Sequence, residues 1–203
     1  MTSASRATGD GRHVNKMRRS LGTLCGLLAP FVVALLVWVV AAPRSELVSV
    51  GGGRGVRFPD SGADGGSQLL MLVILLGFAS ICGALVLWSR HVELRRPAGV
   101  PVLALLPGFA CALAAVGAPW IADLLASSPR DVPFGEVVAQ APTAGALFFD
   151  GMLYGTSGPS WEWFPPGSGW LLWGAMIAMF TVAALAHFSR WPDLVAAESR
   201  TDR

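Results

Sequence analysis

The side chain best suited to chemistry in this sequence is the carboxylate of Asp150. Its neighbours Phe148 and Phe149 would hold it partly away from water, which favours the protonated form of a carboxylate. Together with Asp123 and Glu162 it could form an acidic cluster that handles protons or cations. The simpler interpretation, which we prefer, is a solvated loop carboxylate or a helix cap.

The histidines and cysteines give little basis for a metal site. The histidines are distributed over a tail, a turn and the end of an apolar segment: His13, His91 and His187. No two of them share the i, i+4 spacing of ligands on one helix. Cys25, Cys82 and Cys111 all lie in apolar segments, where cysteine usually serves as a small apolar filler. We therefore expect no metal, no disulfide framework and no cofactor.

Motifs for covalent or phosphate chemistry are also lacking. The sequence contains no Gly-x-Ser-x-Gly, Cys-x-x-Cys or His-Glu-x-x-His pattern. The glycine cluster Gly51–Gly53 does not belong to a phosphate-binding loop, because the Lys-Ser/Thr of that motif is missing and the cluster does not open a helix. The sequence leans against an enzyme without deciding the matter.

Four long apolar segments must position whatever chemistry the chain has. They cover residues 21–42, 68–88, 101–122 and 170–188. Each has about 20 residues, enough for a helix to cross a hydrocarbon core of roughly 30 Å. The 203 residues are 53% hydrophobic and only 14% charged, unlike an ordinary soluble domain. The sequence therefore predicts an all-α membrane protein, a four-transmembrane-helix bundle formed by residues 21–188.

Basic residues are distributed unevenly about these segments. Most lie in residues 1–20, 89–100 and 189–203: Arg6, Arg12, Lys16, Arg18, Arg19, Arg90, Arg95, Arg96, Arg190, Arg200 and Arg203. Lys and Arg in short loops favour the cytoplasmic side of a membrane. We therefore expect a multi-pass protein of the cytoplasmic (cell) membrane with both termini inside, and with residues 43–67 and 123–169 as outer loops. A net charge of only +2 gives no reason to expect nucleic acid as a partner.

The two ends of the chain are predicted to be tails rather than domains. Residues 1–20 are polar and rich in Ser, Gly and Arg, which predicts a disordered cytoplasmic tail, and residues 189–203 form the second cytoplasmic tail. Met17 is an alternative start. The first apolar segment is longer than the core of a signal peptide, so cleavage is the less favoured interpretation.

The outer loops carry further structural signals. In the first loop, β-favouring runs on either side of Gly51–Gly53 predict a small β-hairpin. In the second, the semi-apolar residues 134–154 predict an interfacial helix, or two short ones because of Pro142. An aromatic stretch follows, with a candidate partner patch at Trp161, Trp163 and Phe164. Anchoring at the membrane interface is the more conservative interpretation of this stretch.

Small residues and tryptophans predict how the helices are arranged. The small residues are Gly77, Ser80 and Gly83 in the second apolar segment, and Gly108, Ala110, Ala114 and Ala118 in the third. Such faces let helix backbones approach closely in a membrane, so we expect these two segments to pack as an antiparallel hairpin. The tryptophans near segment ends are predicted to form aromatic belts: Trp38, Trp88, Trp170 and Trp173.

The layout of the chain also suggests a family. It combines an Arg-rich tail, Ala/Gly/Leu/Val-rich spans, a first outer loop that follows Ala41-Ala42-Pro43 and ends in the Gly/Asp-rich stretch Asp60–Gly66, and a basic turn from Arg90 to Pro97. In this it resembles a set of uncharacterised actinobacterial four-span membrane proteins grouped under a domain of unknown function. The aromatic second outer loop departs from their pattern. The resemblance implies a four-span fold and carries no catalytic residues.

Three functions stay open for such a chain. The favoured one is a non-catalytic subunit or scaffold of a cytoplasmic-membrane complex, with membrane lipids and other membrane proteins or a second copy as partners. The alternative is a small transporter or permease-like component, in which Asp150 or Asp123 would couple transport to an ion. The third is a membrane enzyme of envelope lipid metabolism that uses the outer carboxylates.

Overall fold

The computed structural model describes residues 7–44, 46–51, 54–57, 65–125, 133–139, 142 and 167–189. Four long helices account for most of them: α1 (Ala7–Ala41), α2 (Gly65–Arg90), α3 (Val100–Leu125) and α5 (Ser168–Phe188). The segments of these helices that are long and apolar enough to cross a membrane are Ser20–Ala41, Gly66–Arg90, Pro97–Leu124 and Ser168–Phe188. The predicted four-helix membrane bundle is confirmed, and the chain is a multi-pass membrane protein.

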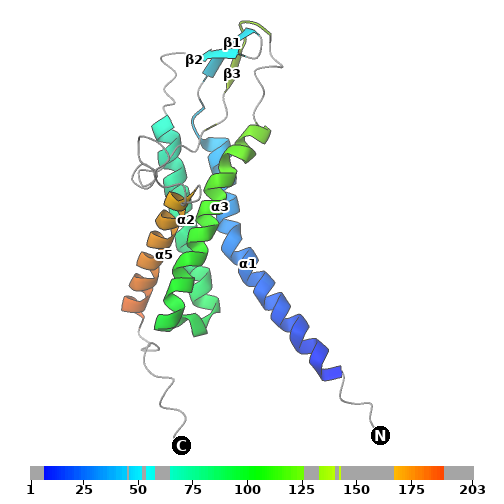
Figure 1. The fold of residues 1–203 in the computed structure, drawn as a ribbon, viewed down its shortest axis with the longest axis vertical. Helices are drawn as coiled ribbons and strands as arrows, with labels where there is room; N and C mark the ends of the chain where they lie inside the picture. The colour runs from blue at the N-terminus through cyan, green and yellow to red at the C-terminus, as the bar shows by residue number, and fades with distance from the viewer. Residues whose placement is uncertain are drawn as a thin grey trace, which may run out of the picture.

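The helices run alternately up and down, so that connections fall at two opposite ends of the bundle (Figure 1). One end, here called the sheet end, carries the three strands. The other, the turn end, carries two short 3₁₀ helices between α2 and α3, η1 (Val92–Arg95) and η2 (Pro97–Gly99). Helices α2 and α3 lie at the centre of the bundle, because each of them contacts both α1 and α5.

Helix α1 begins earlier than the sequence predicts. Residues 7–20, expected to belong to a disordered tail, are helical from Ala7 onward and run away from the other helices (Figure 1). The apolar span already forms a helix, so the preceding residues extend it without the unfavourable free energy of nucleating a new helix. The stretch from Lys16 to Arg19 consists of good helix formers and contains no proline. Residues 1–6 and 190–203 lie outside the described residues.

A three-stranded antiparallel sheet stands at the sheet end, with the strand order β2-β1-β3 (Figure 1). Strands β1 (Glu46–Gly51) and β2 (Arg54–Arg57) form the hairpin that the sequence predicts, with an irregularity between Ser49 and Gly51. Strand β3 (Val137–Ala139) pairs with the other edge of β1.

Strand β3 corrects the prediction of a helical second outer loop, as far as that loop is described. Gly135, with a φ of 85°, turns the chain so that its N–H donates to the Ser49 carbonyl at 2.8 Å. The β-branched residues Val137 and Val138 favour a strand, and the open edge of β1 supplies the hydrogen-bonding partner that makes one possible. Residues 126–132, 140–141 and 143–166 of this loop lie outside the described part of the chain.

Tryptophans at the sheet end face the protein more than the sequence predicts. Trp38 is fully buried, Trp170 is buried, and the half-buried Trp173 of α5 donates its indole N–H to the Val73 carbonyl of α2 at 3.3 Å. A buried indole needs an acceptor for its N–H, and neighbouring helices supply one here. Trp120, which is exposed near the end of α3, occupies the kind of position expected of an aromatic belt.

Hydrogen bonds tie the sheet to the ends of α1 and α2. The Trp38 indole N–H donates to the Gln68 carbonyl at 3.0 Å. The side-chain amide of Gln68 in turn donates to the Pro43 carbonyl at 2.6 Å, just before β1. Arg44 donates to the Val39 carbonyl at 3.2 Å. These contacts, which we call the brace, fix the direction in which β1 leaves α1.

Candidate functional site

The closest helix crossing joins α3 and α5, not α2 and α3. A Cβ added to Gly108 would come within 2.8 Å of the Leu171 carbonyl oxygen and 3.0 Å of the Ala175 Cβ. On the facing helix, a Cβ added to Gly174 would meet the Cys111 Cβ at 2.5 Å. Glycine is therefore required on both sides of this crossing.

The other predicted packing residues also lie at contacts, with several different partners. Gly77 of α2 faces Trp173 of α5, whereas Gly83 faces Leu27 of α1 and Pro107 of α3. The remaining predicted residues are buried: Ser80, Ala110, Ala114 and Ala118. The predicted positions thus lie between helices, and α2 and α3 do contact each other. Their small faces also meet α1 and α5, because a small-residue face does not specify which helix it meets.

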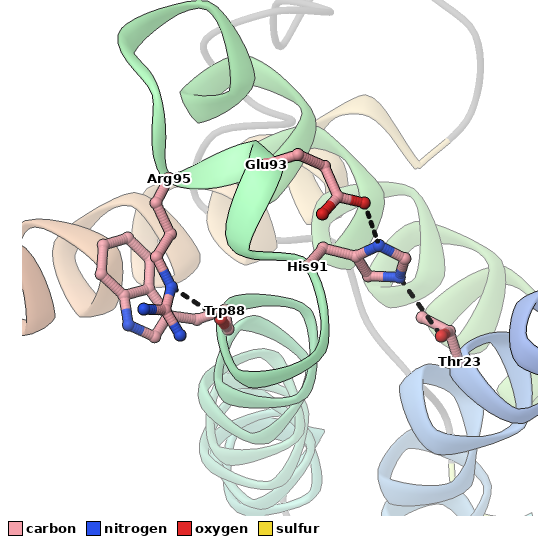
Figure 2. Close-up of polar contacts among 5 residues, drawn as sticks. All are labelled: Thr23, Trp88, His91, Glu93 and Arg95. Carbon is pink, nitrogen blue, oxygen red and sulfur yellow. Dashed lines mark hydrogen bonds and ion pairs between the residues drawn. The ribbon is translucent and has the colours of Figure 1, made fainter. Parts of the chain in front are cut away.

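A polar cluster occupies the turn end, where the sequence predicted only a basic turn. His91 contacts Glu93 through Nδ1 at 3.1 Å and the Thr23 hydroxyl of α1 through Nε2 at 3.2 Å (Figure 2). Arg95 donates from Nε to the Trp88 carbonyl at 3.1 Å, and its guanidinium carbon lies 5.2 Å from the centre of the Trp88 ring. The cluster therefore links α1, the end of α2 and η1.

The pKa of Glu93 reflects the electrostatics of this cluster. The hydrogen bond from His91, followed by one from the backbone, lowers the pKa of Glu93 below its ordinary value of 4.5. One carboxylate oxygen of Glu93 contacts His91 while its side chain stays 71% exposed, and Arg95 uses its Nε–H on the Trp88 carbonyl. Arg90 and Arg96 are exposed at the same end.

Arg90 reaches from α2 to the backbone of α1. Its Nη1 donates to the carbonyl of Gly22, one turn before Gly26 on the same helix. Both glycines face α2: a Cβ at Gly22 would lie 3.4 Å from Arg90 Nη1, and one at Gly26 would lie 3.2 Å from a methyl group of Val86. This contact is not predicted from the sequence. The spacing of the two glycines is the signal that could have revealed it.

A second surface is the open face of the sheet. Val48 of β1 lies directly between Val56 of β2 and Val137 of β3, so the three side chains form one row, the valine row. Val56 is 58% exposed and Val137 is 51% exposed. Ser49, which points to the other face, is buried. Leu47, on the same face as Ser49, is half-buried, so among the described side chains the face of the valine row is the more open one.

The remaining candidates from the sequence contribute little to either surface. Asp150 and the partner patch of Trp161, Trp163 and Phe164 lie outside the described residues. Asp123 is exposed near the end of α3. Within the described part of the chain, no three His, Cys, Asp or Glu residues come together as metal ligands.

No protein-family model matches the chain, and neither curated proteins nor solved structures give a significant match. What the protein does is therefore inferred from its own residues.

Proposed function

We propose that the chain is a non-catalytic scaffold of the cytoplasmic membrane that associates with a second copy of itself through the valine row, with both termini inside. The exposed valine row is the observation that carries this proposal. The apolar side chains along the helices have lipid to cover them. The valine row stands beyond the membrane-spanning segments, where water is the alternative to a protein partner.

Charge at the ends of the open face favours a second copy as the occupant. By strand alternation, Glu46 and Arg54 lie on the same face as the valine row, at its opposite ends along the strands, and both are exposed. In a two-fold contact whose axis runs across the strands, the same patch meets itself with the strand direction reversed. Such a contact brings Glu46 of one copy towards Arg54 of the other while the valines pack against each other.

The membrane compensates for the small size of this face. Stable soluble dimers bury about 800 Å² per partner, more than three short strands can offer. Two copies held in one bilayer meet in a shared orientation and at a raised effective concentration, which lowers the contact area needed. The positive-inside distribution of Lys and Arg supports the orientation proposed here.

The interior of the bundle supports a structural role over transport. The Ser80 hydroxyl donates to the Leu76 carbonyl at 2.8 Å, and the Gln68 amide donates within the brace. Thr181 of α5 donates to the Ile177 carbonyl at 2.8 Å. The polar groups of these buried or half-buried side chains hold backbone in place, which is the role expected in a scaffold.

Counting copies in membranes tests the proposal. Fluorescently labelled protein in phosphatidylcholine vesicles should bleach in two steps, and the double variant Val56→Lys, Val137→Lys should bleach in one step at the same surface density. The matched control is Val92→Lys, which alters an exposed valine at the turn end and should leave two steps. Single-step bleaching of the unaltered chain, or equal loss in the control, overturns the proposal.

A further inference from the structure

Helix α1 is packed unevenly along its length. Six side chains in the half nearer the sheet are buried: Phe31, Ala34, Leu35, Trp38, Val39 and Ala42. In residues 20–29, the half nearer the turn end, all of which the structure describes, Leu27 alone is buried. Towards its N-terminus the helix runs away from the bundle (Figure 1). We call residues 20–29 the arm, because this half of α1 has far less apolar burial to hold it.

A proline stands at the boundary between the two halves. Pro30 lies inside α1 and has no backbone N–H, so the helical hydrogen bond to the Gly26 carbonyl is missing. The arm also contains Gly22 and Gly26, whose backbones are less restricted than those of other residues. Sharp bends in long helices occur at prolines and glycines of this kind. Helix α1 is therefore weakest at the point where its close packing against the bundle ends.

Two polar contacts and one leucine hold the arm against the bundle. Arg90 donates from Nη1 to the Gly22 carbonyl, and His91 contacts the Thr23 hydroxyl through Nε2 at 3.2 Å. We call this pair of contacts the latch. The leucine, Leu27, lies in a small buried cluster with residues of α2 and α3: Ala84, Leu87 and Leu103. With so little apolar burial in the arm, the latch supplies a large part of what keeps it in place.

Charge at the turn end opposes the latch. The turn between α2 and α3 has three arginines and a single acidic residue, Glu93. In the first 20 residues of the chain, five basic residues stand against one acidic residue, Asp10. Two of the five, at positions 18 and 19, precede the latched residues by about one helical turn, which is within the Debye length of about 8 Å. Repulsion between the two basic segments therefore pushes the arm away from the turn.

We propose that the arm swings about Pro30 between a latched position, held by Arg90 and His91, and an open position in which Leu27 has left its buried cluster. The half of α1 nearer the sheet stays packed, so the movement is confined to the turn end. It changes the separation between the start of α1 and the turn between α2 and α3. The device is independent of the valine row, which stands at the opposite end of the molecule (Figure 1).

Distances between spin labels on the full-length chain test the movement. The labels are attached at Leu21→Cys and Phe188→Cys, two exposed positions at the turn end of α1 and α5, and measured by double electron–electron resonance in phosphatidylcholine nanodiscs. The three native cysteines are replaced by alanine. Releasing the latch with Arg90→Gln and His91→Ala should lengthen the mean distance by about 5 Å, the displacement that a bend of about 20° gives nine residues from the proline.

Three controls separate the swing from a general loosening of the bundle. The matched variant Arg96→Gln with Val92→Ala removes the same charge from exposed positions of the turn but leaves the latch, so the distance should not change.

A second label pair, Val40→Cys with Leu172→Cys, reports on the sheet half and should be unaffected by releasing the latch. Adding Pro30→Ala to the latch variant restores the missing helical hydrogen bond and should narrow the distribution of the turn-end distance. An unchanged turn-end distance in the latch variant overturns the proposal. So does an equal change in the matched variant or in the second pair, or a distribution that stays broad with Pro30→Ala.

Discussion

At the scale of single residues, the α3–α5 crossing is where the choice of residue is most restricted. Gly108→Ala would place a Cβ 2.8 Å from the Leu171 carbonyl, so the helices must separate. We expect the free energy of unfolding to fall by about 1–3 kcal/mol, as for other overpacked sites. Gly117→Ala in the same helix is the control, because its Cβ would meet nothing within 4 Å. Thermal unfolding in detergent should separate the two variants, and equal midpoints would contradict the crossing.

Glu93 gives a residue-scale prediction about pH. Its pKa is lowered from 4.5 in the folded chain by His91, so the stabilisation from this contact is present above about pH 4.5. It is lost as the pH falls through the lowered value in the folded state. In His91→Ala, the pKa of Glu93 should rise towards its ordinary value. Carbon-13 NMR of glutamate-labelled protein in micelles, with the signal assigned by Glu93→Gln, measures this change, and an unchanged pKa would refute the contact.

At the scale of elements, the strand order determines which cysteine pairs can form disulfides. Val48 and Val137 are direct partners on β1 and β3, whereas Val56 and Val137 are separated by β1. Neighbouring strands lie about 5 Å apart and alternate strands about 10 Å apart, beyond the reach of a disulfide. Under oxidation, the double variant Val48→Cys, Val137→Cys should therefore form a disulfide within the monomer. The double variant Val56→Cys, Val137→Cys should not form one. Mass spectrometry of the digested monomer band distinguishes them, and linkage of the second pair would rule out this order.

Elements differ in how well the sequence predicts them. The membrane-spanning segments and the β1–β2 hairpin were predictable because their signals are local: a long apolar run, and a glycine cluster between β-favouring runs. Strand β3 was not predictable, because its three residues form a strand only by hydrogen bonding to the edge of β1, nearly ninety positions away in the sequence. The inward tryptophans were missed for a similar reason. Their acceptors, Gln68 and Val73, are backbone carbonyls on another helix, which no local pattern marks.

The candidate sites were less predictable than the fold. The valine row depends on the register of three strands, and the Arg90 contact depends on how α1 meets α2. In both cases residues of common types form a candidate site only because of the residues that pack against them in the folded chain. Charge counting did identify Arg90 and Arg96 as a basic turn, because the positive-inside bias is a property of composition.

At the scale of the whole molecule, the proposed orientation predicts which face of the membrane each end meets. A cysteine at Arg54 should react with a membrane-impermeant maleimide added to intact cells, and a cysteine at Arg96 should react only after permeabilisation. The unaltered chain is the control, since its cysteines all lie within the helices. Labelling of Arg96→Cys in intact cells would reverse the orientation and with it the proposed environment of both surfaces.

The brace has a mechanical consequence for the molecule as a whole. Trp38 donates a hydrogen bond to the Gln68 carbonyl in the first turns of α2, and the Gln68 side chain donates one to Pro43 in the short link that leads into β1. These two hydrogen bonds restrict the movement of that link. We therefore expect a displacement of the strands to shift the end of α1 that carries Trp38 and Val39. Gly22 and Thr23 lie near the other end of the same membrane-spanning segment, so we expect this displacement to alter their contacts with Arg90 and His91 as well.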